Sequence, residues 1–196
     1  MANRIRIIAG NFRGRLLEVP QEGTRPLADR VRQALFAILE PRIPGSRVLD
    51  ICAGSGAAGL EALSRGAESV QFIEISRRAT DTIRRNVSAL GVEDLVQIYT
   101  AGALAGLDSV VARHDEVDLI IADPPYDDVT LRNQLLAKIA TNPSPLKGGG
   151  TLVLSRRRSR GGTAQEPPSG LRLVRTLTFG ETEICIYDKC VAEVLG

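Results

Sequence analysis

The chain has 196 residues, of which 43% are hydrophobic and 24% charged, and its formal net charge is +2. These values are typical of one ordinary globular domain with an appendage. No apolar run approaches the roughly 20 residues that cross a bilayer, and the first residues lack the apolar core of a signal peptide. We therefore expect a cytoplasmic protein without membrane contact. Three scattered cysteines and a single histidine, His114, indicate neither a disulfide framework nor a metal site.

The N-terminal segment predicts a β-hairpin followed by a helix. Residues 4–9 alternate Arg and Ile, residues 10–14 are typical of a turn, and residues 15–19 read as a second strand. Residues 28–39 place apolar side chains on one face and therefore predict a helix. Two short strands are marginal alone, so the hairpin should dock on something.

Basic residues gather at two places in the chain. Through residue 32 there are seven arginines against three acids, a net charge of +4. A second cluster, Arg156-Arg157-Arg158 with Arg160, begins a polar loop that we expect to reach residue 170 and to be mobile. Basic clusters on a nearly neutral body favour a polyanion partner, and solvated surface is the alternative for either cluster alone.

The central part of the chain alternates strands and helices and ends in a hairpin. This order predicts an α/β doubly wound sheet with an antiparallel edge. The expected strands are residues 47–51, 70–74, 95–99, 117–122, 151–155, 171–179 and 182–187, and the expected helices are residues 60–65, 76–90, about 104 onward and 131–140.

A Gly-rich turn follows the first of these strands. Gly54, Gly56 and Gly59 fit G-x-G-x-x-G, and Glu74 lies about twenty residues further on, which raises a nicotinamide-dinucleotide interpretation. However, Asp50 lies four residues before Gly54, where a carboxylate would repel a pyrophosphate. An acid there suits a cationic amino-acid group, and Glu74 suits a ribose diol. The ligand that fits best is S-adenosylmethionine.

A second motif, Asp123-Pro124-Pro125-Tyr126, follows the buried strand 117–122. The two prolines stop the strand and stiffen the turn at the end of a sheet where α/β proteins bind ligands. The motif offers a carboxylate, a backbone carbonyl and an aromatic face, which together suit a planar ring with an exocyclic amine. An ordinary strand-to-helix loop is the alternative.

Several motifs together resemble the bacterial 16S rRNA guanine-N2 methyltransferase family, which belongs to the class I S-adenosylmethionine-dependent methyltransferases. The matching segments are Arg6-Ile7-Ile8-Ala9-Gly10, Gly14-Arg15, Gly23-Thr24-Arg25-Pro26, Asp29-Arg30-Val31-Arg32, Ala34-Leu35-Phe36, Val48-Leu49-Asp50, Ala53-Gly54-Ser55-Gly56, the run from Gly59 to Ala67, the Asp-Pro-Pro-Tyr motif and Phe179-Gly180-Glu181-Thr182. The N-terminal block and the Leu-Glu-Ala-Leu-Ser-Arg-Gly-Ala helix are more specific than the tetrapeptide, which many amino-group methyltransferases share.

The resemblance implies a Rossmann-like, seven-stranded methyltransferase domain at residues 41–196 and an RNA-docking hairpin and helix at residues 1–40. It implies methyl transfer from S-adenosylmethionine to the exocyclic amine of one guanine of 16S rRNA, in an assembling small subunit, by an enzyme that we expect to be a monomer. The expected catalytic residues are Asp123, Pro124, Pro125 and Tyr126. The expected cofactor-binding residues are Asp50, Ala53, Gly54, Ser55, Gly56, Glu74, Ile75, Gly102, Ala103 and Asp123.

The predicted RNA-contact residues are all arginines. For those at 25, 30 and 32, an internal ion pair with Asp29 or the carboxylate of the cofactor is an equal alternative. The predicted RNA-contact residues are Arg4, Arg13, Arg15, Arg25, Arg30, Arg32, Arg156 and Arg157.

One departure from the family concerns recognition of the cofactor's adenine. Methyltransferases often place an acid after the third strand, whereas this chain has Gly102 and its neighbours.

Three other functions remain open from the sequence. Modification of adenine N6, or of another nucleic-acid amino group, is disfavoured by the N-terminal block and by the lack of a separate target-recognition domain. A nicotinamide-dependent oxidoreductase would bind the nicotinamide cofactor instead. A non-catalytic RNA-binding protein would have no need of the Asp-Pro-Pro-Tyr motif.

Overall fold

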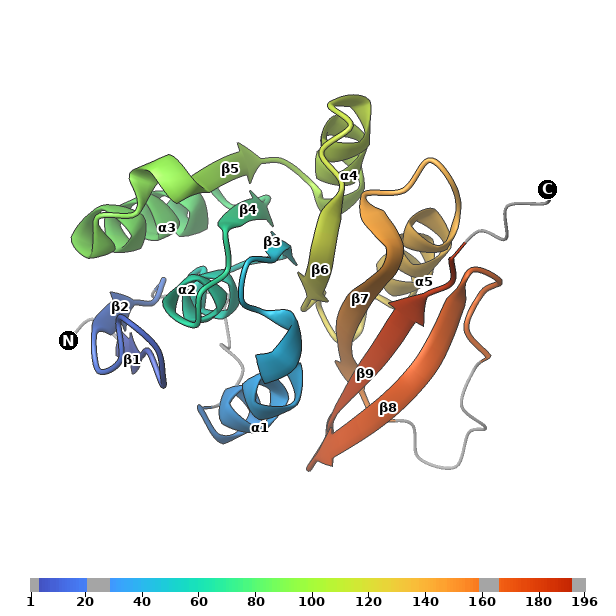
Figure 1. Cartoon of the computed structure of the whole chain (residues 1–196), viewed down its shortest axis with the longest axis horizontal. Coiled ribbons are helices and arrows are strands. Elements are labelled where there is room, and N and C mark those ends of the chain that lie inside the picture. The colour runs from blue at the N-terminus through green and yellow to red at the C-terminus, as the bar shows by residue number, and fades with distance from the viewer. Residues whose placement is uncertain (1–3, 21–28, 159–165, 192–196) are drawn as a thin grey trace.

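The computed structural model describes residues 4–20, 29–158 and 166–191. A seven-stranded sheet with the strand order β5-β4-β3-β6-β7-β9-β8 forms its centre, and β9 runs antiparallel to its neighbours β7 and β8 (Figure 1). The predicted α/β doubly wound sheet with an antiparallel edge is therefore confirmed. The strands are β3 (Arg47–Ile51), β4 (Ser69–Glu74), β5 (Val96–Thr100), β6 (Val117–Ala122), β7 (Leu146–Arg157), β8 (Leu171–Phe179) and β9 (Thr182–Lys189).

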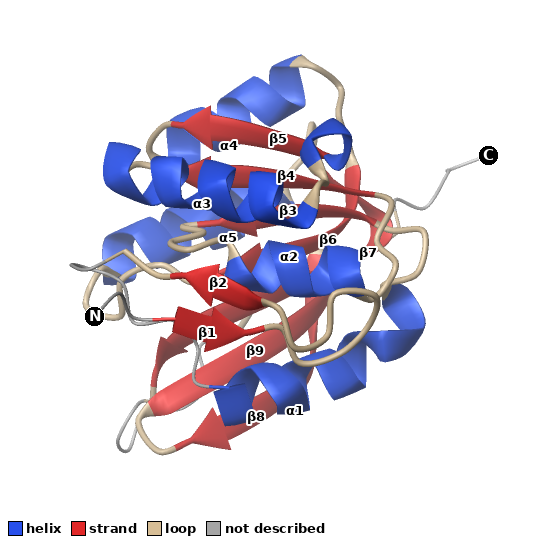
Figure 2. Ribbon diagram, turned by 90° about the vertical axis from the view of Figure 1, so that its left-hand side faces the viewer, coloured by secondary structure: helices blue, strands red, loops and turns tan. Residues whose placement is uncertain are grey.

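Helices cover both faces of the sheet, which makes three layers (Figure 2). α1, α2 and α3 pack on one face and α4 and α5 on the other, because successive strand residues point to opposite sides. On β3, Val48 joins the first core cluster while Leu49 and Ile51 join the second. The helices are α1 (Asp29–Leu39), α2 (Ala57–Ser64), α3 (Arg77–Leu90), α4 (Ala103–Ala112) and α5 (Val129–Ala140), with short 3₁₀ turns η1 (Glu40–Arg42) and η2 (Glu93–Leu95).

The strand order puts β3 beside β6, where the chain reverses its direction of progress across the sheet. The α2 and α3 crossovers lead from β3 outward to β5, whereas β6 returns to the other side of β3. Open α/β sheets bind ligands outside the carboxyl ends of strands at such a switch point. The Gly-rich turn follows β3 and the Asp-Pro-Pro-Tyr turn follows β6, so the topology brings the two motifs together.

Both ends of β7 extend beyond the strand predicted from the sequence. β7 begins at Leu146 rather than at residue 151, because the Lys-Gly-Gly-Gly segment continues the strand through a register shift: Val117 pairs with Leu146, and Leu119 with Thr151. The strand also runs on through Arg157, so part of the expected loop is sheet, and residues 159–165 of that loop lie outside the described residues. Glycine clusters read as turns, and only the neighbouring strand reveals the pairing.

The predicted N-terminal hairpin is present as a separate two-stranded sheet of β1 (Arg4–Arg6) and β2 (Leu16–Glu18). It lies against the α1–α3 side of the molecule (Figure 1). Ile7 and Leu17 are both 1% exposed and belong to the same core cluster as Phe36 and Phe72. The described part of the expected appendage therefore shares a core with the sheet and its helices.

The hairpin is held by α2 through a buried carboxylate. Glu61 is fully buried and accepts backbone N–H groups from Ile8 at 2.8 Å and Ala9 at 3.1 Å. The Ser64 hydroxyl donates to the Ala9 carbonyl at 2.5 Å. Gly10 has φ of +83°, and a Cβ at this position would lie 1.7 Å from the Ser64 carbonyl oxygen. Only glycine permits the hairpin turn to approach α2 this closely.

A second attachment joins β2 to α3. The Asn86 side chain accepts the Glu18 N–H at 2.8 Å and donates to the Glu18 carbonyl at 3.0 Å. It also donates to the carbonyl of Ser55, in the Gly-rich turn, at 3.0 Å. Asn86 is 2% exposed, so the hairpin and the Gly-rich turn share one buried polar side chain.

Among the described residues, none of the helices has the length and apolarity that a membrane span needs.

Candidate functional site

Three carboxylates lie along the carboxyl edge of the sheet. Asp50 is in β3, Glu74 ends β4 and Asp123 directly follows β6, and these three strands are neighbours. Backbone bonds extend the pairing past the strand ends: the Asp123 N–H donates to the Ile51 carbonyl at 3.1 Å, and the Cys52 N–H to the Ile73 carbonyl at 2.9 Å. The two predicted site motifs thus form one site.

The Gly-rich turn is shaped by two of these acids. Glu74 accepts the Gly54 N–H at 2.9 Å on one oxygen and the Ser76 N–H at 2.8 Å on the other. Asp50 accepts the Gly59 N–H, in the first turn of α2, at 2.9 Å. The sequence interpretation assigned these acids to a ligand alone, whereas the structure shows that they also organise the loop. An ionised carboxylate has about four acceptor positions, so each retains capacity for a ligand.

The charge state of Asp50 is set by its burial. Desolvation raises the pKa of Asp50 to about 7, and the nearby Asp123 and Glu74 carboxylates also act to raise it, whereas the Gly59 N–H lowers it. A cation placed beside Asp50 would favour its ionised form and so offset both the burial and the repulsion by the neighbouring carboxylates. The site is therefore suited to a positively charged ligand group and unsuited to a phosphate.

The Asp-Pro-Pro-Tyr turn is bonded to the last strands of the sheet. The hydroxyl of Ser155, in β7, donates to one carboxylate oxygen of Asp123. The hydroxyls of Tyr126 and Thr182 are hydrogen-bonded at 3.0 Å. Burial raises the pKa of Asp123 to about 6, although the Ser155 hydrogen bond lowers it. Sequence reasoning did not identify Ser155, since a serine in a strand carries no signal until its partner is known.

Many methyltransferases place an acid after the third strand. After β5, the third expected strand, this chain instead has Gly102, which lies near the apolar side chain of Ile75. Ile75, directly after Glu74, is 74% exposed, which is unusual for isoleucine next to a site. A Cβ at Gly102 would lie 3.9 Å from the Ile75 Cδ1 atom, so the Gly102–Ala103 start of α4 lies against this side chain. The predicted cofactor residues from three strand ends are thereby placed along one edge of the sheet.

Of the predicted RNA-contact arginines, Arg32 is not available to RNA. It is 1% exposed, donates to the Arg6 carbonyl at 2.5 Å and lies 4.0 Å from the Glu61 carboxylate. Arg32 is thus paired internally with Glu61, a partner that the sequence analysis did not name. Phe36 is fully buried, as expected for a core residue.

The remaining arginines divide into two groups. Arg4, Arg13, Arg15 and Arg30 are exposed on the hairpin and on α1, whereas Arg25 lies outside the described residues. Arg156 forms an ion pair with Glu183 at 2.9 Å and has a side chain only 17% exposed. Arg157, whose side chain is 57% exposed, lies 3.4 Å from Asp127.

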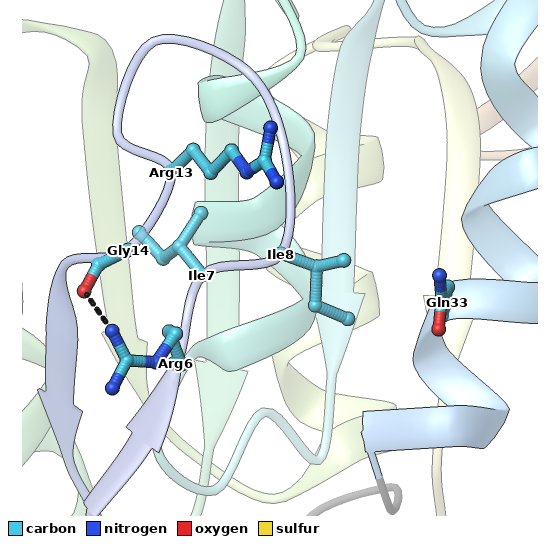
Figure 3. Close-up of a pocket in the computed structure, with 6 residues that line it drawn as sticks. All are labelled: Arg6, Ile7, Ile8, Arg13, Gly14 and Gln33. Atoms are coloured by element: carbon cyan, nitrogen blue, oxygen red, sulfur yellow. Dashed lines mark hydrogen bonds between the residues drawn. The ribbon is translucent and has the colours of Figure 1, made fainter.

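A pocket of about 440 Å³ lies between the hairpin and α1 (Figure 3). In the figure, Ile8 points toward Gln33 of α1, and the Arg13 side chain extends above Ile7. The Arg6 guanidinium is held by the Gly14 carbonyl at 3.2 Å. The pocket therefore combines apolar walls, two guanidinium groups and one amide.

Across the described part of the chain, no three His, Cys, Asp or Glu side chains form a cluster that could hold a metal.

This sheet order, with acids on β3 and β4 and an Asp-Pro-Pro-Tyr turn after β6, is that of a class I methyltransferase. The family model described as conserved hypothetical protein 95 matches residues 5–188, and the chain belongs to this family. The chain is 32% identical over 186 residues to the putative rRNA methyltransferase YlbH of Bacillus subtilis (strain 168), and the match covers 94% of this chain and 99% of that protein.

Other relatives carry functional names. The chain is 39% identical over 126 residues to ribosomal RNA small subunit methyltransferase D of Escherichia coli (strain K12); the match covers 64% of this chain and 62% of that protein. Among solved structures, yhhF of Escherichia coli superimposes with a TM-score of 0.82 at 30% identity, covering 96% of this chain and 99% of that one.

Proposed function

We propose that this protein is an S-adenosylmethionine-dependent methyltransferase that modifies the N2 amine of one guanine in 16S rRNA. One observation carries the proposal: the Asp50 and Glu74 carboxylates at the switch point lie next to the Asp-Pro-Pro-Tyr turn, which supplies the third carboxylate, Asp123. The name of the Escherichia coli relative supports small-subunit rRNA as the substrate. The proposed partner is an assembling small subunit, met in the cytoplasm by a monomer.

In this proposal the residues of the Gly-rich turn hold the cofactor. Asp50 binds the amino group of its methionine end, beside Ala53, Gly54, Ser55 and Gly56. Glu74 binds the ribose diol, and Ile75 with Gly102 and Ala103 encloses the adenine through apolar contact and backbone groups. S-adenosylmethionine would supply a methyl group that its sulfonium already activates and would leave as S-adenosylhomocysteine, and the proton of the methylated amine would pass to water.

The Asp-Pro-Pro-Tyr turn then places the acceptor amine. An exocyclic guanine amine is a poor nucleophile, because its lone pair is delocalised into the ring. The Asp123 carboxylate and the Pro124 carbonyl accept its two hydrogens and favour a tetrahedral nitrogen, while Tyr126 stacks on the base for about 1–3 kcal/mol. Pro125 keeps the turn stiff. Orientation of this kind reaches effective molarities of ~10⁵ M or more.

For RNA docking we propose the surface of the hairpin and α1. Its exposed arginines Arg4, Arg13, Arg15 and Arg30 carry charge toward phosphates, and the pocket beside Gln33 offers apolar walls and polar groups to one unstacked nucleotide. The Arg25 contact stays a prediction, as does a secondary contribution of Arg156 and Arg157. A target guanine that is paired or stacked must leave its stack before it reaches Tyr126.

One experiment tests the proposal and its rivals together. The protein is incubated with labelled S-adenosylmethionine and, in separate reactions, with naked 16S rRNA, small subunits and DNA, and the nucleosides are then identified by mass spectrometry. We expect N2-methylguanosine from the small-subunit RNA. N6-methyladenine in DNA would instead establish the rival methyltransferase. Binding of a nicotinamide cofactor without S-adenosylmethionine binding would overturn the class of reaction.

A further inference from the structure

The Asp-Pro-Pro-Tyr turn makes two side-chain contacts with the C-terminal strands that the proposed mechanism does not use. Ser155 of β7 donates to Asp123, and Thr182, the first residue of β9, bonds to the Tyr126 hydroxyl. In the sheet, β7 and β9 lie on the opposite side of β6 from β3 and its Gly-rich turn. Both contacts involve the two side chains that the mechanism assigns to the target base.

We propose that Ser155 and Thr182 are positioning residues that fix the acceptor carboxylate and the aromatic platform for the target amine. This inference rests on the proposed function, because it concerns the same turn. Ser155 and Thr182 act through Asp123 and Tyr126, and neither needs to touch the substrate.

The sheet register explains why Ser155 reaches the acid. Ala122 of β6 pairs with Leu154 of β7, so Asp123 and Ser155 are the next residues on two parallel neighbouring strands. Ser155 is 3% exposed, and water cannot replace its hydroxyl freely. The hydroxyl donates a hydrogen bond to one carboxylate oxygen of Asp123, and this bond fixes the rotation of the carboxyl group. The second oxygen is then presented to the target amine.

The register also explains how Thr182 reaches the ring. Arg157 of β7 pairs with Thr182 of β9, and the Arg157 guanidinium lies 3.4 Å from the carboxylate of Asp127, the residue after Tyr126. One register pair thus contacts two consecutive residues of the turn. The hydroxyl bond fixes the far end of the Tyr126 ring, and therefore the plane on which a base would stack.

The experiment compares Ser155→Ala and Thr182→Val with the parent protein. The matched control is Thr151→Val, which removes a hydroxyl that is likewise buried in β7 and hydrogen-bonded, but four residues from Ser155. Single-turnover methyl transfer, the affinity for S-adenosylmethionine and thermal unfolding are measured for each variant. The acceptor is whichever nucleic acid the parent protein methylates, so a wrong assignment of the RNA target does not affect this test.

For Ser155→Ala we expect the single-turnover rate to fall by roughly ten-fold or more, as for a lost hydrogen bond to a charged group, with cofactor affinity within a few-fold of the parent. The acidic limb of the pH–rate profile should also move to higher pH, because the lost bond stabilised the carboxylate. A purely structural role would not move that limb. If Ser155→Ala unfolds, Ser155→Cys keeps the volume with a weaker donor and takes its place.

For Thr182→Val the coupling with Tyr126 is decisive. Tyr126→Phe removes the same hydrogen bond, so the double variant should be no slower than the slower single variant, and Thr182→Ser should restore the parent rate. Parent rates and an unshifted pH profile in folded Ser155 variants, or additive losses at Thr182 and Tyr126, would overturn the inference. Absence of methyl transfer by the parent protein on every acceptor would instead overturn the proposed function, and the inference with it.

Discussion

At the residue scale, Asp50 combines the strongest functional expectation with an unfavourable environment. Asp50 is 2% exposed, and burial raises its pKa to about 7. An acid whose folded pKa is raised destabilises the folded protein as pH rises from the unfolded value near 4 through 7. A bound cation offsets this destabilisation, so the site gives up some stability of the free protein in favour of ligand affinity.

The first prediction follows from this conflict. Asp50→Asn should weaken S-adenosylmethionine binding by roughly 1.5–3 kcal/mol, because a charge-assisted bond to its amino group is removed. The same variant without cofactor should have a higher Tm than the parent at about pH 8, and this gain should disappear near pH 4. Calorimetry and thermal unfolding at both pH values measure the two effects.

Asp118→Asn provides the control for that experiment. Burial alone would raise the pKa of Asp118, but bonds from the Arg47 N–H and the Lys147 ammonium outweigh it and lower the pKa. Asp118 thus contributes stability above the unfolded pKa, and this stability disappears as pH falls through its folded value. Its replacement should lower Tm at about pH 8 and leave cofactor affinity unchanged. An Asp50→Asn protein with parent-like affinity would refute the assignment of Asp50.

The second residue-scale prediction concerns Asp123. Asp123→Ala should remove most methyl transfer while leaving S-adenosylmethionine affinity within a few-fold, because its partner is the target amine. In the parent, the methyl-transfer rate should fall as pH drops below about 6, since the Asp123 carboxylate must be ionised to accept hydrogens from the target amine. Single-turnover rates over roughly two pH units on either side of this value measure the dependence. A loss confined to apparent substrate affinity would show that Asp123 binds without acting in the transition state.

At the element scale, α2 joins the Gly-rich turn to the hairpin. Its first turn donates the Gly59 N–H to Asp50, and Glu61, two residues later, holds Ile8 and Ala9. Glu61 also accepts the Arg65 guanidinium at 2.8 Å, directly after the helix. A helix of eight residues therefore connects the proposed cofactor site with the proposed RNA surface.

The third prediction tests this connection. Glu61→Gln should lower the free energy of unfolding by about 3–5 kcal/mol, because it removes the buried negative charge that faces the Arg32 and Arg65 guanidinium groups. Denaturant unfolding measures the loss, and Glu68→Gln, which changes an exposed acid after the same helix, is the control. Equal stability of the two variants would show that Glu61 does not hold the hairpin.

At the scale of the whole molecule, the hairpin serves as part of the core as well as a candidate RNA surface. Because Ile7 and Leu17 belong to the core cluster of the sheet, deletion of residues 1–20 should destabilise the entire protein. That deletion therefore does not isolate RNA docking. Replacing exposed charge is the cleaner test.

The fourth prediction uses such a replacement. Arg13→Gln with Arg15→Gln should weaken binding to small subunits and reduce the salt slope by roughly 0.7 to 0.9 for each phosphate that the variant no longer binds. Affinity for S-adenosylmethionine should stay the same. The control, Arg113→Gln with Lys138→Gln, removes equal charge at the ends of α4 and α5, across the sheet from the hairpin. Equal slopes in parent and variant would move the RNA surface to Arg156 and Arg157.

The sequence by itself determined the elements that have a local cause. Alternating or apolar runs predicted the strands, and the order of elements predicted the doubly wound sheet. The two ligand motifs were visible because glycine and proline restrict the backbone locally, and because acids at strand ends are chemically distinctive. Asp50, Glu74 and the Asp-Pro-Pro-Tyr turn needed no structure to be singled out.

The tertiary structure alone decided which polar side chains meet. The sequence left Arg32 open between RNA contact and an internal ion pair, and it could not name the partner Glu61, because only the packing of α1 against α2 brings the two together. Ser155 reads as an ordinary strand residue until the β6–β7 register places it beside Asp123. Hydrophobic periodicity records which face of an element is covered, whereas contacts between residues far apart in the chain depend on strand order and register, which no local pattern encodes.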